Sequence, residues 1–183
     1  MNRTLLYVML FIVFILIVST FEPSAISVVL VTVIITLLKY VITLIHELGH
    51  YFTGKLIGYP VKAVIIGDRK QFWIVTFCGT QFIFCYGFGG LTLMQSENKP
   101  SRLRYSIFAL GGVMLQLVII SMVYFTLGIG SEDNYYLPLW FIVLNVWTIM
   151  SNLYPSIIVR YEENYFSDGL LLKKIWLDKE SDR

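Results

Sequence analysis

The two histidines of this 183-residue chain lie four residues apart, in the segment His46-Glu47-Leu48-Gly49-His50. Residues i and i+4 share one face of an α-helix, so both imidazoles can bind one metal ion. Zinc accepts neutral imidazole nitrogen, and a glutamate beside the first histidine can take a proton from a water molecule at the metal. The segment therefore predicts a zinc hydrolase centre in which His46 and His50 are ligands and Glu47 is the general base.

A catalytic zinc ion takes three protein ligands and keeps one position open. Because there is no third histidine, the third ligand must be a carboxylate or a thiolate. Asp168 precedes a glycine and three leucines, so it can begin a helix that faces protein. The residues alone favour Asp168 and leave Glu162 and Glu163 open. The other downstream candidates are Asp68, Cys78, Cys85, Glu97, Glu132 and Asp133.

The composition places this chemistry in a membrane. Hydrophobic residues make up 57% of the chain and charged residues 14%, against about 45–50% and about 25% in an average soluble protein. These values argue against a soluble enzyme, a disordered chain and a nucleic-acid-binding protein, and the net charge of +2 gives no sign of a phosphate-binding surface. Ionisable residues at membrane depth are costly and mark functional sites.

The apolar runs predict a mainly α membrane protein, built as a single domain over residues 1–183. Four transmembrane helices are expected, at about 4–21, 26–56, 105–128 and 136–158. Residues 61–94 are rich in β-branched and aromatic residues broken by glycines, which predicts a small antiparallel, membrane-associated sheet or hairpin between the second and third helices. Residues 170–183 are expected to form a C-terminal tail.

The charged residues predict the orientation. Lysine and arginine gather between the second and third helices and in the tail, whereas residues 21–25 and 129–135 carry acids and no lysine or arginine. The positive-inside rule therefore predicts a multi-pass protein of the cell membrane with both termini in the cytoplasm.

An HExxH motif at the end of a membrane helix, followed by a glycine-rich β segment, resembles the site-2 protease family of intramembrane zinc metalloproteases. Residues 79–94, with Gly89-Gly90, resemble the family's membrane-associated hairpin, and residues 109–116 resemble its small-residue helix motif. Asn152-Leu153-Tyr154-Pro155 followed by Asp168-Gly169 resembles its Asn-x-x-Pro…Asp-Gly motif. In that family the aspartate is the third zinc ligand, so the resemblance implies this role for Asp168.

The chain departs from the family pattern in two places. Gly112 stands where the family commonly has proline, and Gln116 where it commonly has asparagine. The gap between Pro155 and Asp168 is longer than usual, which we interpret as a loop bulging towards the cytoplasm. Gly111 and Gly112 are expected to let two helices approach closely.

Five further residues are candidates for substrate binding. Asn152 and Gln116 lie in apolar helices, where each amide has two interpretations. It contacts the substrate backbone or orients Asp168, as the resemblance implies, or it makes a hydrogen bond between helices. Thr80, Gln81 and Phe82 belong to the segment Thr80–Phe84, which we expect to offer a sheet edge to an extended substrate.

The predicted function is hydrolysis of peptide bonds in membrane-anchored substrates by an intramembrane zinc metalloprotease. The alternative is a zinc-binding membrane protein without protease activity, acting as a binding or immunity factor. The expected partners are a membrane-anchored peptide or protein and the lipid bilayer, with no nucleic acid, and the oligomeric state stays open.

Overall fold

The computed structural model describes residues 25–95, 101–127, 136–160 and 163–177. The chain divides into two compact units, Met1–Lys39 and Tyr40–Arg183, whose boundary falls inside the first described helix. The described part of the first unit is the beginning of that helix. The candidate site belongs to the second unit. The helix predicted at 4–21 lies outside the described residues.

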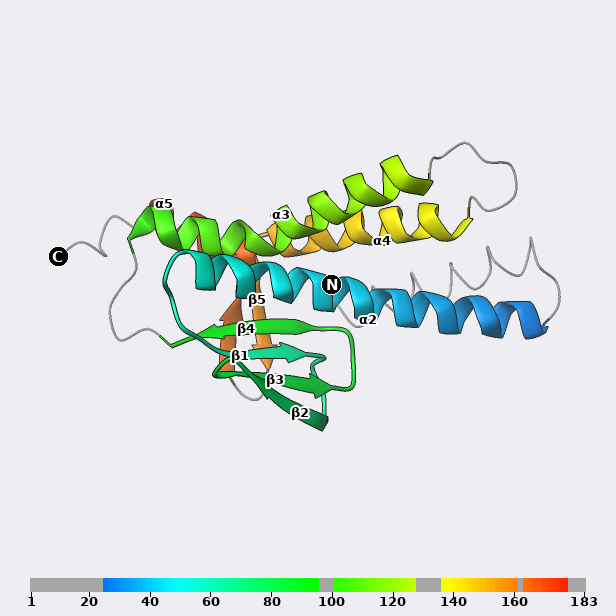
Figure 1. Ribbon diagram of the computed structural model, residues 1–183, viewed down its shortest axis with the longest axis horizontal. Coiled ribbons are helices and arrows are strands. Elements are labelled where there is room, and N and C mark those ends of the chain that lie inside the picture. Colours follow the sequence, from blue (N-terminus) through cyan, green and yellow to red (C-terminus); the bar gives the residue numbers. More distant parts are fainter. Residues whose placement is uncertain (1–24, 96–100, 128–135, 161–162, 178–183) are drawn as a thin grey trace. The chain divides into compact units, whose positions relative to one another are not determined.

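Three long apolar helices form most of the described chain (Figure 1): α2 (Ala25–Leu56), α3 (Arg102–Leu127) and α4 (Tyr136–Leu153). The helices predicted at 26–56 and 105–128 are confirmed to within a few residues. The helix predicted at 136–158 ends earlier, at Leu153. Pro155 explains this end, because it lacks a backbone N–H and disfavours helical conformation at the residue before it.

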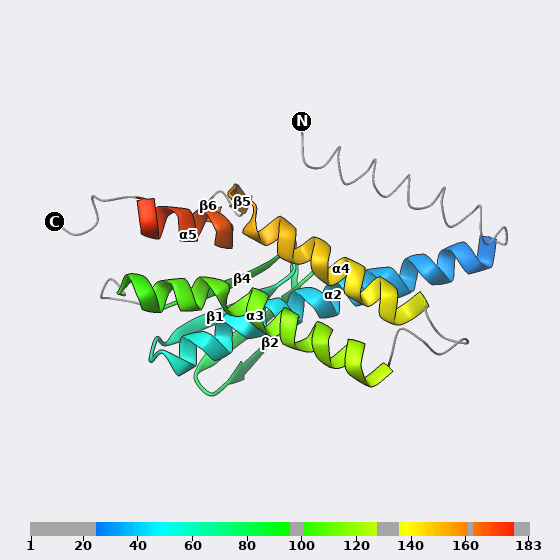
Figure 2. The same cartoon turned by 90° about the horizontal axis from the view of Figure 1, so that it is seen from above.

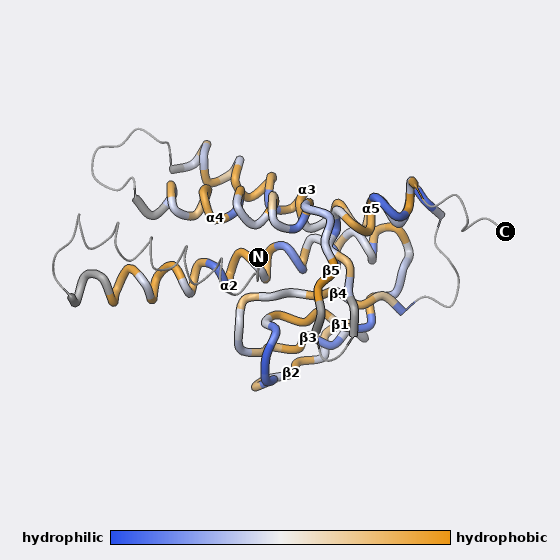
Figure 3. Tube along the Cα trace, turned by 180° about the vertical axis from the view of Figure 1, so that it is seen from behind, coloured by the Kyte–Doolittle hydropathy of each residue, from blue (hydrophilic) through white to orange (hydrophobic). Residues whose placement is uncertain are grey.

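Two of these helices are long and apolar enough to cross a membrane, over Val29–Leu56 and Arg102–Thr126. The apolar part of α4, Pro138–Leu153, is shorter. Hydrophobic residues follow one another along much of α3 (Figure 3). Its side chains Met114, Val118 and Phe125 are each more than half exposed. Such a surface suits lipid better than water. Of the four predicted membrane spans, two meet the length requirement within the described residues.

The segment predicted as a sheet folds into four strands: β1 (Val61–Ile66), β2 (Gln71–Phe77), β3 (Thr80–Cys85) and β4 (Gly90–Met94). Their order is β2-β3-β1-β4, and β1 runs parallel to β3. The sheet is thus mixed, and the prediction of an antiparallel sheet was wrong. After β1 the chain forms β2 at the outer edge of the sheet. It then turns back at Cys78 and Gly79, so that β3 lies between β2 and β1. Both turn residues have positive φ, as tight hairpins require.

The strand order decides which strands are edges. β3 pairs with β2 on one side and β1 on the other, so the sheet edge predicted at Thr80–Phe84 was wrong. The two edges of this sheet are β2 and β4. The inner strand β1 buries Val61, Val64 and Ile66 against Tyr51 of α2, which holds the sheet beside the HExxH segment.

The long gap between Pro155 and Asp168 is a β-hairpin rather than a loop. Strand β5 (Ile157–Arg160) pairs with β6 (Glu163–Phe166), with Ile157 opposite Phe166. Helix α5 (Asp168–Leu177) follows, so the predicted tail begins as a helix. It packs along the N-terminal part of α3 (Figure 2), where Trp176 Nε1 donates a hydrogen bond of 3.1 Å to Ser106 Oγ.

Helices α2 and α3 touch backbone to backbone at three glycines. A Cβ atom on Gly49 would collide with the carbonyl of Gly111 and lie 2.7 Å from Gly112 Cα. A Cβ atom on Gly111 would collide with Thr53 Oγ1 and lie 2.7 Å from the Gly49 carbonyl oxygen. The predicted close approach at Gly111 and Gly112 is therefore confirmed.

We expect Gly49→Ala to lower the free energy of unfolding by about 1–3 kcal/mol, because backbone cannot move aside as a side chain can. Gly54→Ala is the comparison on the same helix: its new methyl group would lie 2.8 Å from the Val61 Cγ2 methyl group, so it displaces a side chain and we expect a smaller loss. Thermal unfolding of the metal-free variants in detergent compares them. Equal stability of the two variants would contradict the backbone contact.

Candidate metal centre

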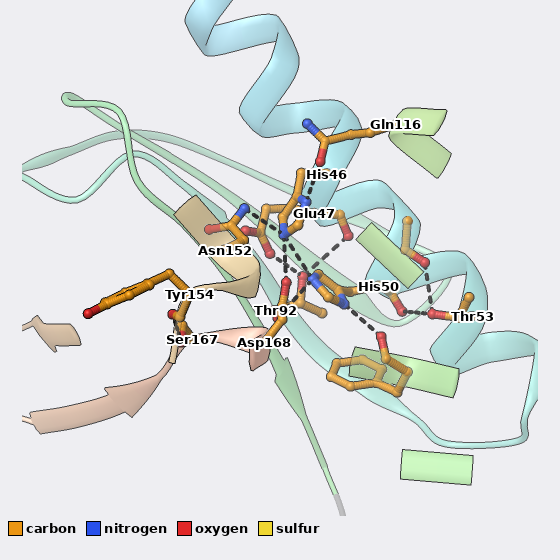
Figure 4. A network of polar contacts seen from close by, with 12 residues as sticks. His46, Glu47, His50, Thr53, Thr92, Gln116, Asn152, Tyr154, Ser167 and Asp168 are labelled. Atoms are coloured by element: carbon orange, nitrogen blue, oxygen red, sulfur yellow. Dashed lines mark hydrogen bonds and ion pairs between the residues drawn. The ribbon is translucent and has the colours of Figure 1, made fainter. Parts of the chain in front are cut away.

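Three side chains from two distant parts of the chain meet in one buried place (Figure 4). His46 and His50 come from α2, and Asp168 is the first residue of α5. His46 Nε2 lies 3.1 Å from His50 Nε2 and 3.1 Å from Asp168 Oδ2, and His50 Nε2 lies 3.4 Å from Asp168 Oδ1. Both histidines are 4% exposed. The arrangement brings together two imidazole nitrogens and a carboxylate.

These three residues fit a zinc ion. Ligand atoms about 2.0–2.1 Å from a tetrahedral zinc lie about 3.3 Å from one another, close to the spacing observed. Asp168 Oδ2 is buried, and it faces His46 Nε2 at 3.1 Å, as two ligands of one metal ion would. Burial raises the pKa of the Asp168 carboxyl. The charge of His50 and hydrogen bonds from His46 and His50 lower that pKa by more, so it falls below its usual value. The carboxylate therefore stays ionised, as a metal ligand must be.

The other ring nitrogen of each histidine has a fixed partner. His50 Nδ1 lies 2.8 Å from the carbonyl oxygen of Phe108, which can only accept, so Nδ1 carries a proton and Nε2 is the nitrogen that would bind a metal ion. His46 Nδ1 lies 2.8 Å from Gln116 Oε1. The bare α3 backbone at Gly112 makes room for the His46 ring, since a Cβ there would lie 2.5–2.7 Å from three ring atoms.

Glu47 is buried beside the cluster and held from β4. Thr92 Oγ1 donates a hydrogen bond of 2.7 Å to Glu47 Oε2. Gly90, two residues earlier on the same strand, faces the Glu47 carboxylate so closely that a Cβ atom would collide with it. The edge strand thus fixes the orientation of the candidate base.

The start of α5 is tied to the end of α4. Ser167 Oγ donates to the carbonyl of Tyr154 at 2.8 Å and accepts from the backbone N–H groups of Ser156 and Leu170 at 2.9 and 3.3 Å. A Cβ atom on Gly169 would collide with the carbonyl of Leu153. These contacts explain why an aspartate-glycine pair stands here, since only glycine lets α5 begin this close to α4.

A family model covers the part of the chain that carries this cluster. The model of peptidase family M50 matches residues 32–172, a stretch that encloses the HExxH segment and Asp168. The chain belongs to peptidase family M50, the site-2 protease family. No curated protein compared with this chain matches it. An M50 protein is a metallopeptidase, and the two long apolar helices accord with a membrane protein.

The remaining predicted site residues of this M50 chain are placed differently. Asn152 is half-buried and its Nδ2 lies 3.0 Å from His46 Nε2, so it contacts the cluster. Gln116 is fully buried and both ends of its amide are bonded. The substrate contact predicted for Gln116 is therefore replaced by a contact to His46.

The predicted β3 residues do not line the cluster. Thr80 is fully buried and donates to the Val61 carbonyl at 2.9 Å, and Phe82 packs against the core around Tyr51. Gln81 is exposed on the same inner strand. Their predicted role rested on an edge that β3 does not have.

The sequence reasoning missed four groups that hold this M50 site: Thr92, Ser167, Asn145 and the Phe108 carbonyl. Ser167 carried a readable signal, because serine before a helix start is a preferred N-cap. Asn145 carried the same signal as Asn152, an amide in an apolar helix. The roles of Thr92 and of a backbone carbonyl depend on which strand and helix lie beside α2, which spacing along the chain does not show.

We expect Asp168→Ala to lose bound zinc, because two neutral imidazoles make an incomplete ligand set. Thr92→Val is the matched control: it removes a neighbour of Glu47 and leaves all three candidate ligand atoms in place. Metal analysis of the purified proteins after zinc loading and desalting measures both. Full zinc occupancy in Asp168→Ala would rule out Asp168 as the third ligand.

Proposed function

We propose that this M50 metallopeptidase is an intramembrane protease that uses zinc to hydrolyse peptide bonds in membrane-anchored proteins or peptides. The observation that carries the proposal is the convergence of His46, His50 and Asp168, with Glu47 alongside. Family membership supports a peptidase of the site-2 type. The four-span arrangement, the multi-pass location and the cytoplasmic termini belong to the same proposal.

The residues divide the chemistry between them. His46, His50 and Asp168 would hold the zinc ion, which when bound polarises a peptide carbonyl and lowers the pKa of water. The Glu47 carboxylate accepts a proton from the attacking water and later donates it to the leaving amide nitrogen. Thr92 keeps that carboxylate in one orientation, because its hydroxyl donates to Oε2.

Strand β4 is the proposed docking place for substrate. A helical substrate buries its carbonyl groups in its own hydrogen bonds, so it must unwind before cleavage. Among the described strands β4 pairs with β1 alone, and its Thr92 contacts Glu47. An extended substrate segment added along the free side of β4 would therefore run next to the candidate base.

We expect Glu47→Gln to keep zinc and to lower cleavage by about 10²–10⁴-fold, because glutamine cannot accept the proton. The measurement compares membrane peptides, by mass spectrometry, in cells carrying the wild type, Glu47→Gln or His46→Ala. Substrates should accumulate in both variants, whereas only His46→Ala should lose zinc. Identical peptide profiles in all three strains would favour the non-proteolytic zinc-binding alternative.

We expect Met94→Pro on β4 to reduce cleavage strongly while zinc stays bound. The N–H of the next residue, Gln95, points to the Pro60 carbonyl on the β1 side, so that of Met94 points away from β1. Proline removes one donor from the free side of the strand. Ile74→Pro on β2, at the opposite edge, is the control and should cleave normally. Cleavage that is unchanged by the β4 proline would exclude docking on this strand.

A further inference from the structure

Two buried amides extend from His46 into the helices behind it. His46 Nδ1 lies 2.8 Å from Gln116 Oε1, and Gln116 Nε2 lies 3.1 Å from Asn145 Oδ1. Asn145 Nδ2 in turn lies 2.8 Å from the backbone carbonyl oxygen of Phe141. Both amide side chains are 0% exposed. The chain of hydrogen bonds runs from α2 through α3 to α4, and Figure 4 shows its first contact.

The far end of this chain sets its direction. The Phe141 carbonyl can only accept, so the Asn145 side chain must turn its NH₂ group towards it. Asn145 Oδ1 then faces Gln116 and can only accept, so Gln116 must turn its own NH₂ group towards Asn145. Gln116 Oε1 is left facing His46. Each amide thus has one allowed orientation, and the backbone of α4 decides both.

The direction reaches the imidazole. Because Gln116 Oε1 can only accept, His46 Nδ1 must carry a ring proton. A metal ion held between His50 and Asp168 would then take the lone pair of Nε2. Without a metal ion, Nε2 faces the Asp168 carboxylate at 3.1 Å, which can also only accept, so the tautomer is defined in the metal-bound protein.

We propose that Gln116 and Asn145 are positioning residues that fix the tautomer of His46, so that Nε2 is the nitrogen presented to the metal. The inference rests on the metal-binding part of the proposed function and does not depend on proteolysis. His50 has no such amide pair, because the Phe108 backbone carbonyl holds its Nδ1 directly. The two ligands therefore reach the same tautomer by different means.

A purely structural role would leave a different signature. Amides between membrane helices also hold the helices together, and for that purpose either direction of the hydrogen bonds would serve. Only the tautomer of His46 depends on the direction. The protonated ring nitrogen is therefore the readout that separates positioning from packing.

The composition of the chain makes that readout simple. The protein contains two histidines, so full-length protein labelled with ¹⁵N-histidine gives signals from two imidazoles. Two-bond ¹H–¹⁵N correlation spectra of the zinc-loaded protein in detergent show which nitrogen of each ring is protonated. His50 serves as an internal control in every sample.

Three variants test the relay. Gln116→Met removes the acceptor, and Asn145→Leu removes the group that orients Gln116, each at similar side-chain size. Asn145→Asp keeps an acceptor towards Gln116, and its protonated form can still donate to the Phe141 carbonyl, so it is the rescue variant. A chelator competition measures the zinc affinity of each protein, and we expect Gln116→Met and Asn145→Leu to weaken it by about 10–100-fold, with Asn145→Asp close to the wild type.

The expected spectra show both rings protonated at Nδ1 and not at Nε2 in the wild type and in Asn145→Asp. In Gln116→Met and Asn145→Leu we expect part of the His46 signal to show the Nε2–H form, because the ring is partly released from zinc, while His50 does not change. A wild-type His46 protonated at Nε2 would overturn the proposal, and this measurement needs no variant to fold. An unchanged His46 in both amide variants would overturn it too. A wild type that does not bind zinc would instead contradict the proposed function.

Discussion

The close contact between α2 and α3 is the constraint on which the site depends. Gly49 of the HExxH segment meets Gly111 and Gly112 without an intervening side chain. The close approach of the two helices places the His50 ring within reach of the Phe108 carbonyl and the His46 ring within reach of Gln116. Any Cβ atom at the crossing would push α3 away and leave both imidazoles without a partner for Nδ1.

The opposite side of α2 is shaped by the sheet. The core around Tyr51 fixes β1 against the helix, and pairing with β1 carries β4 next to Glu47. The missing side chain of Gly90 lets the backbone of β4 approach the Glu47 carboxylate closely. The ligands and the candidate base are therefore held by different neighbours, α3 for the histidines and β4 for the glutamate, so each can be altered without directly disturbing the other.

The family motifs acquire a physical meaning in this structure. Gly112, where the family commonly has proline, provides the space for the His46 ring. Gln116, where the family commonly has asparagine, supports that ring through its longer side chain. The extra residues before Asp168 form a hairpin whose two ends meet at Ser156 and Ser167, so an insertion of this length leaves the start of α5 in place.

The sequence by itself determined helices α2 and α3, the HExxH motif and the choice of Asp168 as a candidate ligand, because helical periodicity, residue chemistry and a family motif are local or can be matched along the chain. It also located the β segment and the helix-packing glycines. It did not determine the order of the strands, the end of α4, or the neighbours of each functional side chain. Whether Thr80 or Thr92 lies at an edge, and whether Gln116 faces a substrate or His46, depends on which elements pack together. Only the tertiary structure decided those contacts, because they join residues that are far apart in the chain and carry no shared pattern.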